Sequence, residues 1–130
     1  MTLETMEPTP TWDPDAHGTV VDRFSALSNR MTVRIWGADW CPDCRNQLPD
    51  FAAALEAAGV PDDRIETYPV DRDKDGELVE EYDVEFIPTI VIEIDGGVVA
   101  RFVESGERSA AEELADQLAA AAVERSEPRD

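Results

Sequence analysis

Two cysteines, Cys41 and Cys44, are the residues of this chain whose type and spacing most clearly predict chemistry. Two residues lie between them, so their sulfurs can come within bonding distance and form or open a disulfide. A Cys-x-x-Cys pair near a βαβ pattern is typical of a redox pair. A closed zinc site would need four ligands. The other soft ligand, His17, lies in a different segment, so the pattern disfavours zinc and predicts no metal.

The neighbouring elements place the cysteines at a strand-to-helix junction. Residues 31–36 alternate and are β-branched, which predicts a strand, and a helix begins at Asp43 or Cys44. Cys41 then precedes the helix N-terminus, where free N–H groups and the helix dipole favour the thiolate that attacks a disulfide. Cys44, one turn into the helix, is placed to resolve the mixed disulfide. Asp43 opposes the thiolate by charge repulsion, and we expect Trp40 to cover one side of the site.

Apolar periodicity and turn residues predict the remaining elements. The expected order is α-β-α-β-α-β-β-α, over residues 20–27, 31–36, 43–58, 65–70, 75–82, 89–94, 98–103 and 109–122. Asp75 is the expected cap of the third helix, residues 95–97 form a hairpin turn, and Ser109 to Glu112 form a capping box. Strands separated by helices pair in parallel, and the final hairpin adds antiparallel pairing. The fold class is therefore α/β, with a mixed central sheet of about four strands flanked by helices on both faces.

Length and composition indicate one folded domain. The chain has 130 residues, and 42% of them are hydrophobic, which is enough for a core without staples. Turn signals and charge divide it into an acidic N-terminal tail over 1–16, a domain over 17–124 and a charged C-terminal tail over 125–130. The acidic N-terminus has no apolar segment, which favours a cytoplasmic protein.

The charge balance is strongly acidic. Thirty Asp and Glu against eleven Lys and Arg give a formal net charge of −19, and Lys74 is the single lysine. Such a surface repels nucleic acids and anionic lipids, so neither is an expected partner. An acid excess with almost no lysine resembles the proteins of halophiles that accumulate salt, in particular haloarchaea, where concentrated cations screen the carboxylates. A GC-rich genome would also favour arginine, but it does not explain thirty acids.

A second motif, over residues 71–76, matches the start of a calcium-binding EF-hand loop. The twelfth position of such a loop is a bidentate Glu, and here it is Tyr82. A strand, and not a helix, is predicted before the motif. We therefore interpret it as a solvated acidic loop, and whether it binds a cation stays open.

Three motifs together resemble the thioredoxin family: the segment from Trp40 to Cys44, Pro49 five residues after the second cysteine, and Ile87-Pro88-Thr89. The resemblance covers residues 17–124. It implies a thioredoxin fold in which Cys41 is the attacking thiol and Cys44 the resolving thiol, and in which Trp40, Pro42 and Asp43 shape the site. It also implies a cis Ile87–Pro88 bond opposite the cysteines, an Ile87 backbone that holds the substrate strand, and Gly106 in the same groove.

The same resemblance implies a function. The protein is expected to reduce protein or small-molecule disulfides through a Cys41/Cys44 dithiol–disulfide cycle, with no cofactor beyond that disulfide and with a thioredoxin reductase as electron donor. Two alternatives stay open: a dedicated reductant of one partner, and a thioredoxin-fold binding module with little turnover. Catalytic reduction that depends on Cys41 distinguishes the enzymes from the binding module.

Three positions depart from the family pattern. The residues between the cysteines are Pro42 and Asp43 instead of Gly and Pro, which is similar to a cytosolic branch with a narrower substrate range. Ile35 stands where the family has a buried acid, so Asp39, Asp43 or water must take over its proton-relay role. The lysine that usually accompanies that acid has no clear counterpart.

Overall fold

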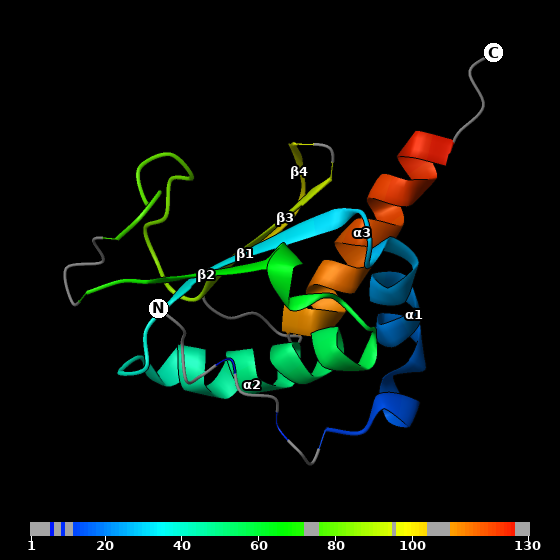
Figure 1. Ribbon diagram of the computed structural model, residues 1–130, viewed down its shortest axis with the longest axis horizontal. Helices are drawn as coiled ribbons and strands as arrows, with labels where there is room; N and C mark the ends of the chain where they lie inside the picture. The colour runs from blue at the N-terminus through cyan, green and yellow to red at the C-terminus, as the bar shows by residue number, and fades with distance from the viewer. Residues whose placement is uncertain are drawn as a thin grey trace.

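The computed structural model describes residues 6, 9, 12–71, 76–94, 96–103 and 110–126, with side chains up to residue 119 in the last helix. These residues form two short 3-10 helices, three α-helices and four strands (Figure 1). In chain order the elements are η2 (Pro14–His17), α1 (Gly18–Leu27), β1 (Met31–Gly37), α2 (Pro42–Ala57), η3 (Asp62–Arg64), β2 (Ile65–Pro69), β3 (Thr89–Ile94), β4 (Gly97–Val103) and α3 (Ala110–Ser126).

The four strands form one mixed sheet in the order β2-β1-β3-β4. The pair β1 and β2 is parallel, because α2 returns the chain to the same end of the sheet, and Ile35 lies opposite Thr67. The pairs β1–β3 and β3–β4 are antiparallel. The expected mixed sheet of four strands is thus confirmed.

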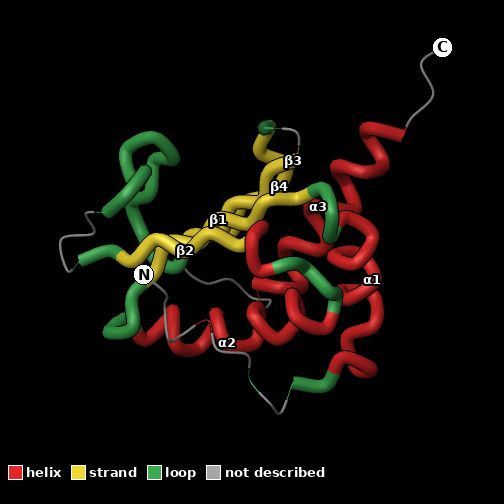
Figure 2. Tube along the Cα trace, viewed as in Figure 1, coloured by secondary structure: helices red, strands yellow, loops and turns green. Residues whose placement is uncertain are grey.

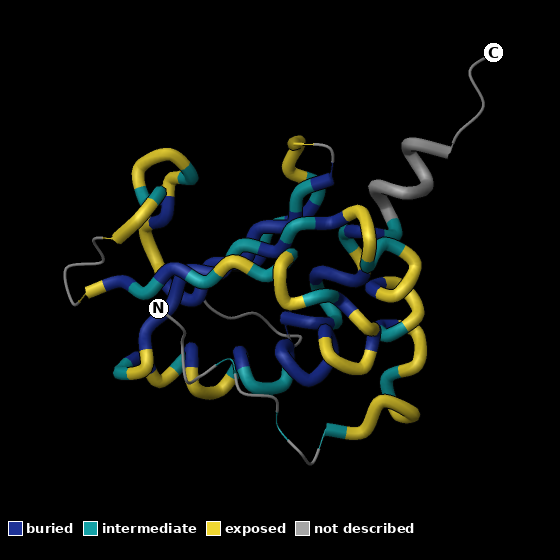
Figure 3. Tube along the Cα trace, in the orientation of Figure 1, coloured by how far each residue is buried: buried dark blue, intermediate teal, exposed yellow. Residues whose placement is uncertain are grey.

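The three α-helices lie together on one face of the sheet (Figures 1 and 2). Alternate residues of β1, namely Met31, Val33 and Ile35, are fully buried, as period-two alternation requires of a strand with one face in the core. Phe24 of α1 packs edge-to-face on Phe51 of α2 within the same core. Figure 3 shows the buried residues concentrated where sheet and helices meet.

Helices were predicted on both faces of the sheet, but the opposite face carries no α-helix among the described residues. The predicted third helix, over residues 75–82, is not formed by the described part of that range. Residues 77–83 form consecutive turns instead. Leu78 and Asp83 have φ angles of 63° and 53°, in the left-handed region that interrupts a right-handed helix. The core contacts of this segment are made by Leu78, Val79 and Tyr82. Their spacing therefore indicated the buried side chains correctly, although the backbone forms turns and not a helix.

Details of the helix ends also differ from expectation. Helix α2 begins at Pro42, one residue before the predicted start, because proline is well suited to the first helical position. Pro49 lies inside α2, as predicted. Asp95 of the predicted hairpin turn and Ser109 of the predicted capping box lie outside the described residues. The N–H of Ala110, at the start of α3, donates to Gln47 Oε1 of α2 at 3.3 Å.

Gly76 begins the turn segment in close contact with the end of β2. A Cβ atom at this position would lie 2.8 Å from the Pro69 carbonyl oxygen and 3.0 Å from Val70 Cγ1. We expect Gly76→Ala to lower the free energy of unfolding by about 1–3 kcal/mol, because the backbone of β2 would have to shift. Urea denaturation measures this. Gly18→Ala is the control, since a Cβ there meets nothing within 4 Å; equal midpoints for the two variants would contradict the prediction.

Candidate active site

Cys41 caps the N-terminus of α2. Its backbone is extended, with φ −87° and ψ 120°, and its Sγ accepts a hydrogen bond from the Cys44 N–H at 3.4 Å. The Cys41 N–H donates to the Ala38 carbonyl at 3.2 Å, which holds the loop between β1 and α2. A sulfur at the helix cap receives both the N–H bond and the positive end of the helix dipole, and both favour a negative charge there.

The second side of the site comes from the segment before β3. The Cys41 thiol lies 3.8 Å from the Ile87 carbonyl oxygen and donates to it, and the Ile87–Pro88 peptide bond is cis. The Thr89 hydroxyl, in a fully buried side chain, donates to the Phe86 carbonyl at 2.6 Å. The fold therefore brings Cys41, Cys44 and Ile87 together, although 46 positions separate Cys41 from Ile87.

The two thiols differ in accessibility, and burial affects the pKa of Cys44. Cys41 is 6% exposed and Cys44 is fully buried, and neither is in a disulfide. Burial is the main cause that raises the pKa of Cys44 to about 12; a backbone hydrogen bond from Ala38 acts against it, and the neighbouring Cys41 and Asp43 contribute to the rise. Cys44 is thus held as a neutral thiol behind Cys41, and Cys41 is the thiol placed for the first attack.

The side chains around the pair are apolar on the inside and acidic on the outside. Ile35 is fully buried beside Thr67 in the sheet register, so this pair of positions carries no charge. Asp39 is exposed and Asp43 is half-buried. The carboxylate of Asp43 acts electrostatically on Cys44.

The other predicted site residues lie on the rim. Trp40 is half-buried and packs against the core, Pro42 is exposed, and Phe86 is 45% exposed immediately before Ile87. Trp40 and Phe86 add apolar surface to the two segments that carry Cys41 and Ile87. Gly106 lies outside the described residues, so its place in the groove stays a prediction.

Sequence reasoning missed a polar network on the sheet face away from the helices. Arg34 Nε donates to Glu93 Oε1 at 2.6 Å and the Arg34 guanidinium also bonds the Tyr68 hydroxyl. The Tyr82 hydroxyl donates to Glu93 Oε2 at 2.7 Å. Arg34 and Glu93 interrupt two otherwise apolar strands, and this was the signal that could have revealed the network.

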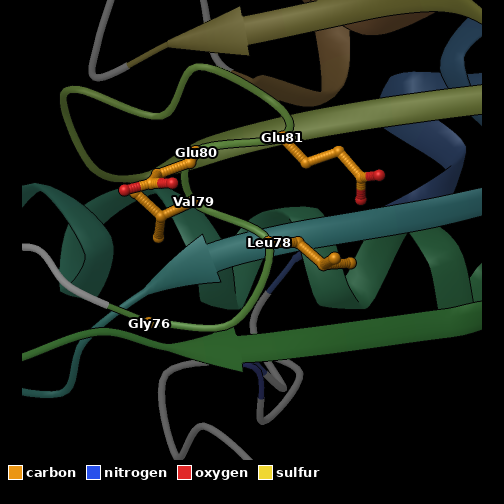
Figure 4. Close-up of a pocket in the computed structure, with 5 residues that line it drawn as sticks. All are labelled: Gly76, Leu78, Val79, Glu80 and Glu81. Atoms are coloured by element: carbon orange, nitrogen blue, oxygen red, sulfur yellow. The ribbon is translucent and has the colours of Figure 1, made fainter.

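A pocket lies in the turn segment, and neither cysteine lines it. It is lined by Gly76, Leu78, Val79, Glu80 and Glu81 of the turn segment. Figure 4 shows that the side chains of its two adjacent glutamates point in different directions. None of these residues belongs to the predicted site, and the pocket offers no thiol.

The described part of the chain contains no cluster of three or more His, Cys, Asp or Glu residues that could hold a metal ion. Residues 72–75 of the calcium-like motif lie outside it, so that hypothesis stays open. Nor does any helix in the described ranges combine the length and apolar character needed to cross a membrane.

The mixed sheet and the cysteine pair at a helix N-terminus define the class of thioredoxin-fold proteins. A family model, Thioredoxin, matches residues 18–120. The chain therefore belongs to the thioredoxin family.

Similar proteins agree with this assignment. The chain is 35% identical over 73 residues to protein disulfide isomerase-like 1-4 of Oryza sativa, and 32% identical over 97 residues to protein disulfide-isomerase of Drosophila melanogaster. The matches cover 56% and 73% of this chain but 13% and 19% of those longer proteins. Among solved structures, thioredoxin-2 of the malaria parasite is 26% identical, with a TM-score of 0.50, over 66% of this chain and 79% of that one. These likenesses support thiol–disulfide oxidoreductase chemistry in general.

Proposed function

We propose that the protein reduces disulfides of proteins or small molecules by cycling between the Cys41/Cys44 dithiol and disulfide. The Cys41 thiolate attacks one sulfur of the substrate, the substrate S–S bond breaks, and the other sulfur leaves as a thiolate that takes up a proton. Cys44 then loses its proton and attacks the Cys41 sulfur, which releases the second substrate thiolate. The substrate gains two electrons, and the protein becomes the Cys41–Cys44 disulfide.

One observation carries this proposal: Cys41 Sγ lies between the Cys44 N–H and the Ile87 carbonyl. The first contact supports a thiolate, and the second brings a peptide backbone to the sulfur that would hold the substrate. Trp40, Pro42 and Asp43 would shape the site around it, and Ile87, Pro88 and Gly106 would bind the substrate. A thioredoxin reductase would return two electrons to the disulfide, and a cytoplasmic location would keep the dithiol reduced.

The test is reduction of insulin disulfides with dithiothreitol as the electron source. We expect the wild type to accelerate reduction and Cys41→Ser to fall to the uncatalysed rate, because the remaining thiol, Cys44, is fully buried and cannot begin the exchange. Cys44→Ser is the matched control: it should also lose turnover, yet after prior reduction and removal of dithiothreitol it should form a lasting mixed disulfide with insulin, visible on a non-reducing gel. A wild type that binds insulin without reducing it would favour the binding module instead.

A further inference from the structure

The segment over residues 76–88 connects β2 to β3 and ends at the site. It runs along the sheet face that has no α-helix among the described residues (Figures 1 and 2). Turns make up its first half, and it then passes through buried Val84 to Ile87, whose carbonyl meets Cys41. A segment without regular helix or strand needs contacts from elsewhere to hold one conformation.

Arg101 of β4 supplies such a contact. Its guanidinium donates from Nη1 to the Tyr82 carbonyl at 2.8 Å and from Nη2 to the Asp83 carbonyl at 3.0 Å. These are consecutive carbonyls, and Asp83 has a positive φ of 53°. The fixed fork of an arginine can bind two adjacent oxygens at once, which a single ammonium does less well. Arg101 thereby fixes the backbone just before the residues that reach the site.

The backbone of Arg101 is itself fixed by hydrogen bonds. It pairs with Val91 in the sheet, its N–H donates to Gln117 Oε1 at 2.8 Å, and its carbonyl accepts from Gln117 Nε2 at 2.8 Å. Gln117 belongs to α3, in the helix layer. One residue therefore links α3, the edge of the sheet and the turn segment on the far face.

The beginning of the segment has separate anchors. Trp36 Nε1 donates to the Glu77 carbonyl at 2.9 Å, and the Trp36 ring contacts the Tyr82 ring at a tilt of 45°, with 5.0 Å between ring centroids. The Tyr82 hydroxyl bonds Glu93. These contacts hold side chains or the first turn. Arg101 holds the main chain at Tyr82 and Asp83, upstream of the Phe86 carbonyl that the Thr89 hydroxyl binds.

We propose that Arg101 is a positioning residue for the site: by binding the Tyr82 and Asp83 carbonyls, it fixes the Ile87 carbonyl against Cys41 and so determines how a substrate's peptide chain is held. The inference rests on the proposed function. It concerns substrates that lie along the Ile87 backbone, and a small disulfide that needs only the Cys41 sulfur is affected less.

The experiment compares Arg101→Met, Arg101→Lys and the control Arg23→Met, which removes the same charge from an exposed position on α1. Two probes are used, insulin and the chromogenic aryl disulfide dithiobis(nitrobenzoate). For Arg101→Met we expect KM for insulin to rise about tenfold, which corresponds to one charge-assisted hydrogen bond, with the rate of the first reaction with the aryl disulfide unchanged. Arg101→Lys should recover part of the loss, and Arg23→Met should match the wild type.

Hydrogen exchange of the amides over residues 84–89 gives a readout that needs no activity. We expect faster exchange there in Arg101→Met, with the amides of β1 unchanged. Unchanged exchange over 84–89, or an equal increase throughout the sheet, would overturn the inference. So would a fall of both probe reactions together, because that indicates general loss of structure. If Arg101→Met does not fold, the same criteria apply to Arg101→Lys. A wild type inactive on insulin would refute the proposed function, and the exchange data would then decide the role of Arg101 alone.

Discussion

The reduced protein is expected to release two aryl thiolates from dithiobis(nitrobenzoate), one after the other. The rate of the second release should rise about tenfold for each unit of pH between about pH 7 and pH 9. Attack by Cys41 releases the first thiolate, and attack by Cys44 on the resulting mixed disulfide releases the second. In the reduced protein the pKa of Cys44 is raised to about 12, chiefly by burial. Because only the thiolate attacks, and its fraction grows tenfold per pH unit below the pKa, the second step follows pH with full slope.

The progress of absorbance in a stopped-flow instrument separates the two steps. Cys44→Ser should show the first release with an unchanged rate and no second release, which assigns the slow phase to Cys44. Cys41→Ser should show neither at neutral pH, since Cys44 is fully buried and protonated. Two releases at equal rates, or a second release that does not vary with pH, would show that a base near Cys44 removes its proton.

The absence of an acid at position 35 could be read from the sequence, whereas the burial of Cys44 required the structure. Ile35 occupies the position on β1, and the register places Thr67 opposite it. Both positions could be predicted by aligning two strands. The complete burial of Cys44 could not, because it depends on how α2 packs on the sheet, and that burial is the main cause of its raised pKa.

The main error in the predicted fold has a local cause. The spacing of Leu78, Val79 and Tyr82 satisfied a helical pattern, yet the segment is too short for that pattern to exclude turns. Periodicity records which side chains are buried, and turns that pack the same side chains leave a similar pattern. The positive φ at Leu78 is set by tertiary contacts, since leucine has no preference for that region.

The cysteine pair was predicted well because its geometry is local. A strand, a loop, a proline at the first helical position and two cysteines one turn apart lie within consecutive residues of the chain. The role of Ile87 was predicted from the family resemblance, but the residues that hold its segment in place were not predicted. Arg101 and Gln117 are ordinary surface residue types, and only the pairing of β4 with β3 and α3 gives them a role.

The melting temperature of the protein is expected to rise by about 10 °C or more between about 0.1 M and about 2 M KCl. With a net charge of −19, carboxylates lie within the screening length of one another at low salt, about 10 Å at 0.1 M, and their repulsion opposes the compact state. At molar salt that length falls to about 3 Å, and most of the repulsion is screened. Calorimetry over a series of KCl concentrations measures the rise.

A charge variant separates screening from the general effect of salt on hydrophobic burial. Asp62, Asp63 and Glu66 are exposed neighbours at the start of β2, so Asp62→Asn, Asp63→Asn and Glu66→Gln together remove three charges from one patch. This variant should melt higher than the wild type at low salt and gain less from KCl. The matched control exchanges Asp and Glu at the same positions, which keeps the charge and should keep the slope. Because the hydrophobic contribution is the same in all three proteins, a difference in slope measures carboxylate repulsion directly. A melting temperature that does not change with KCl would contradict adaptation to high salt.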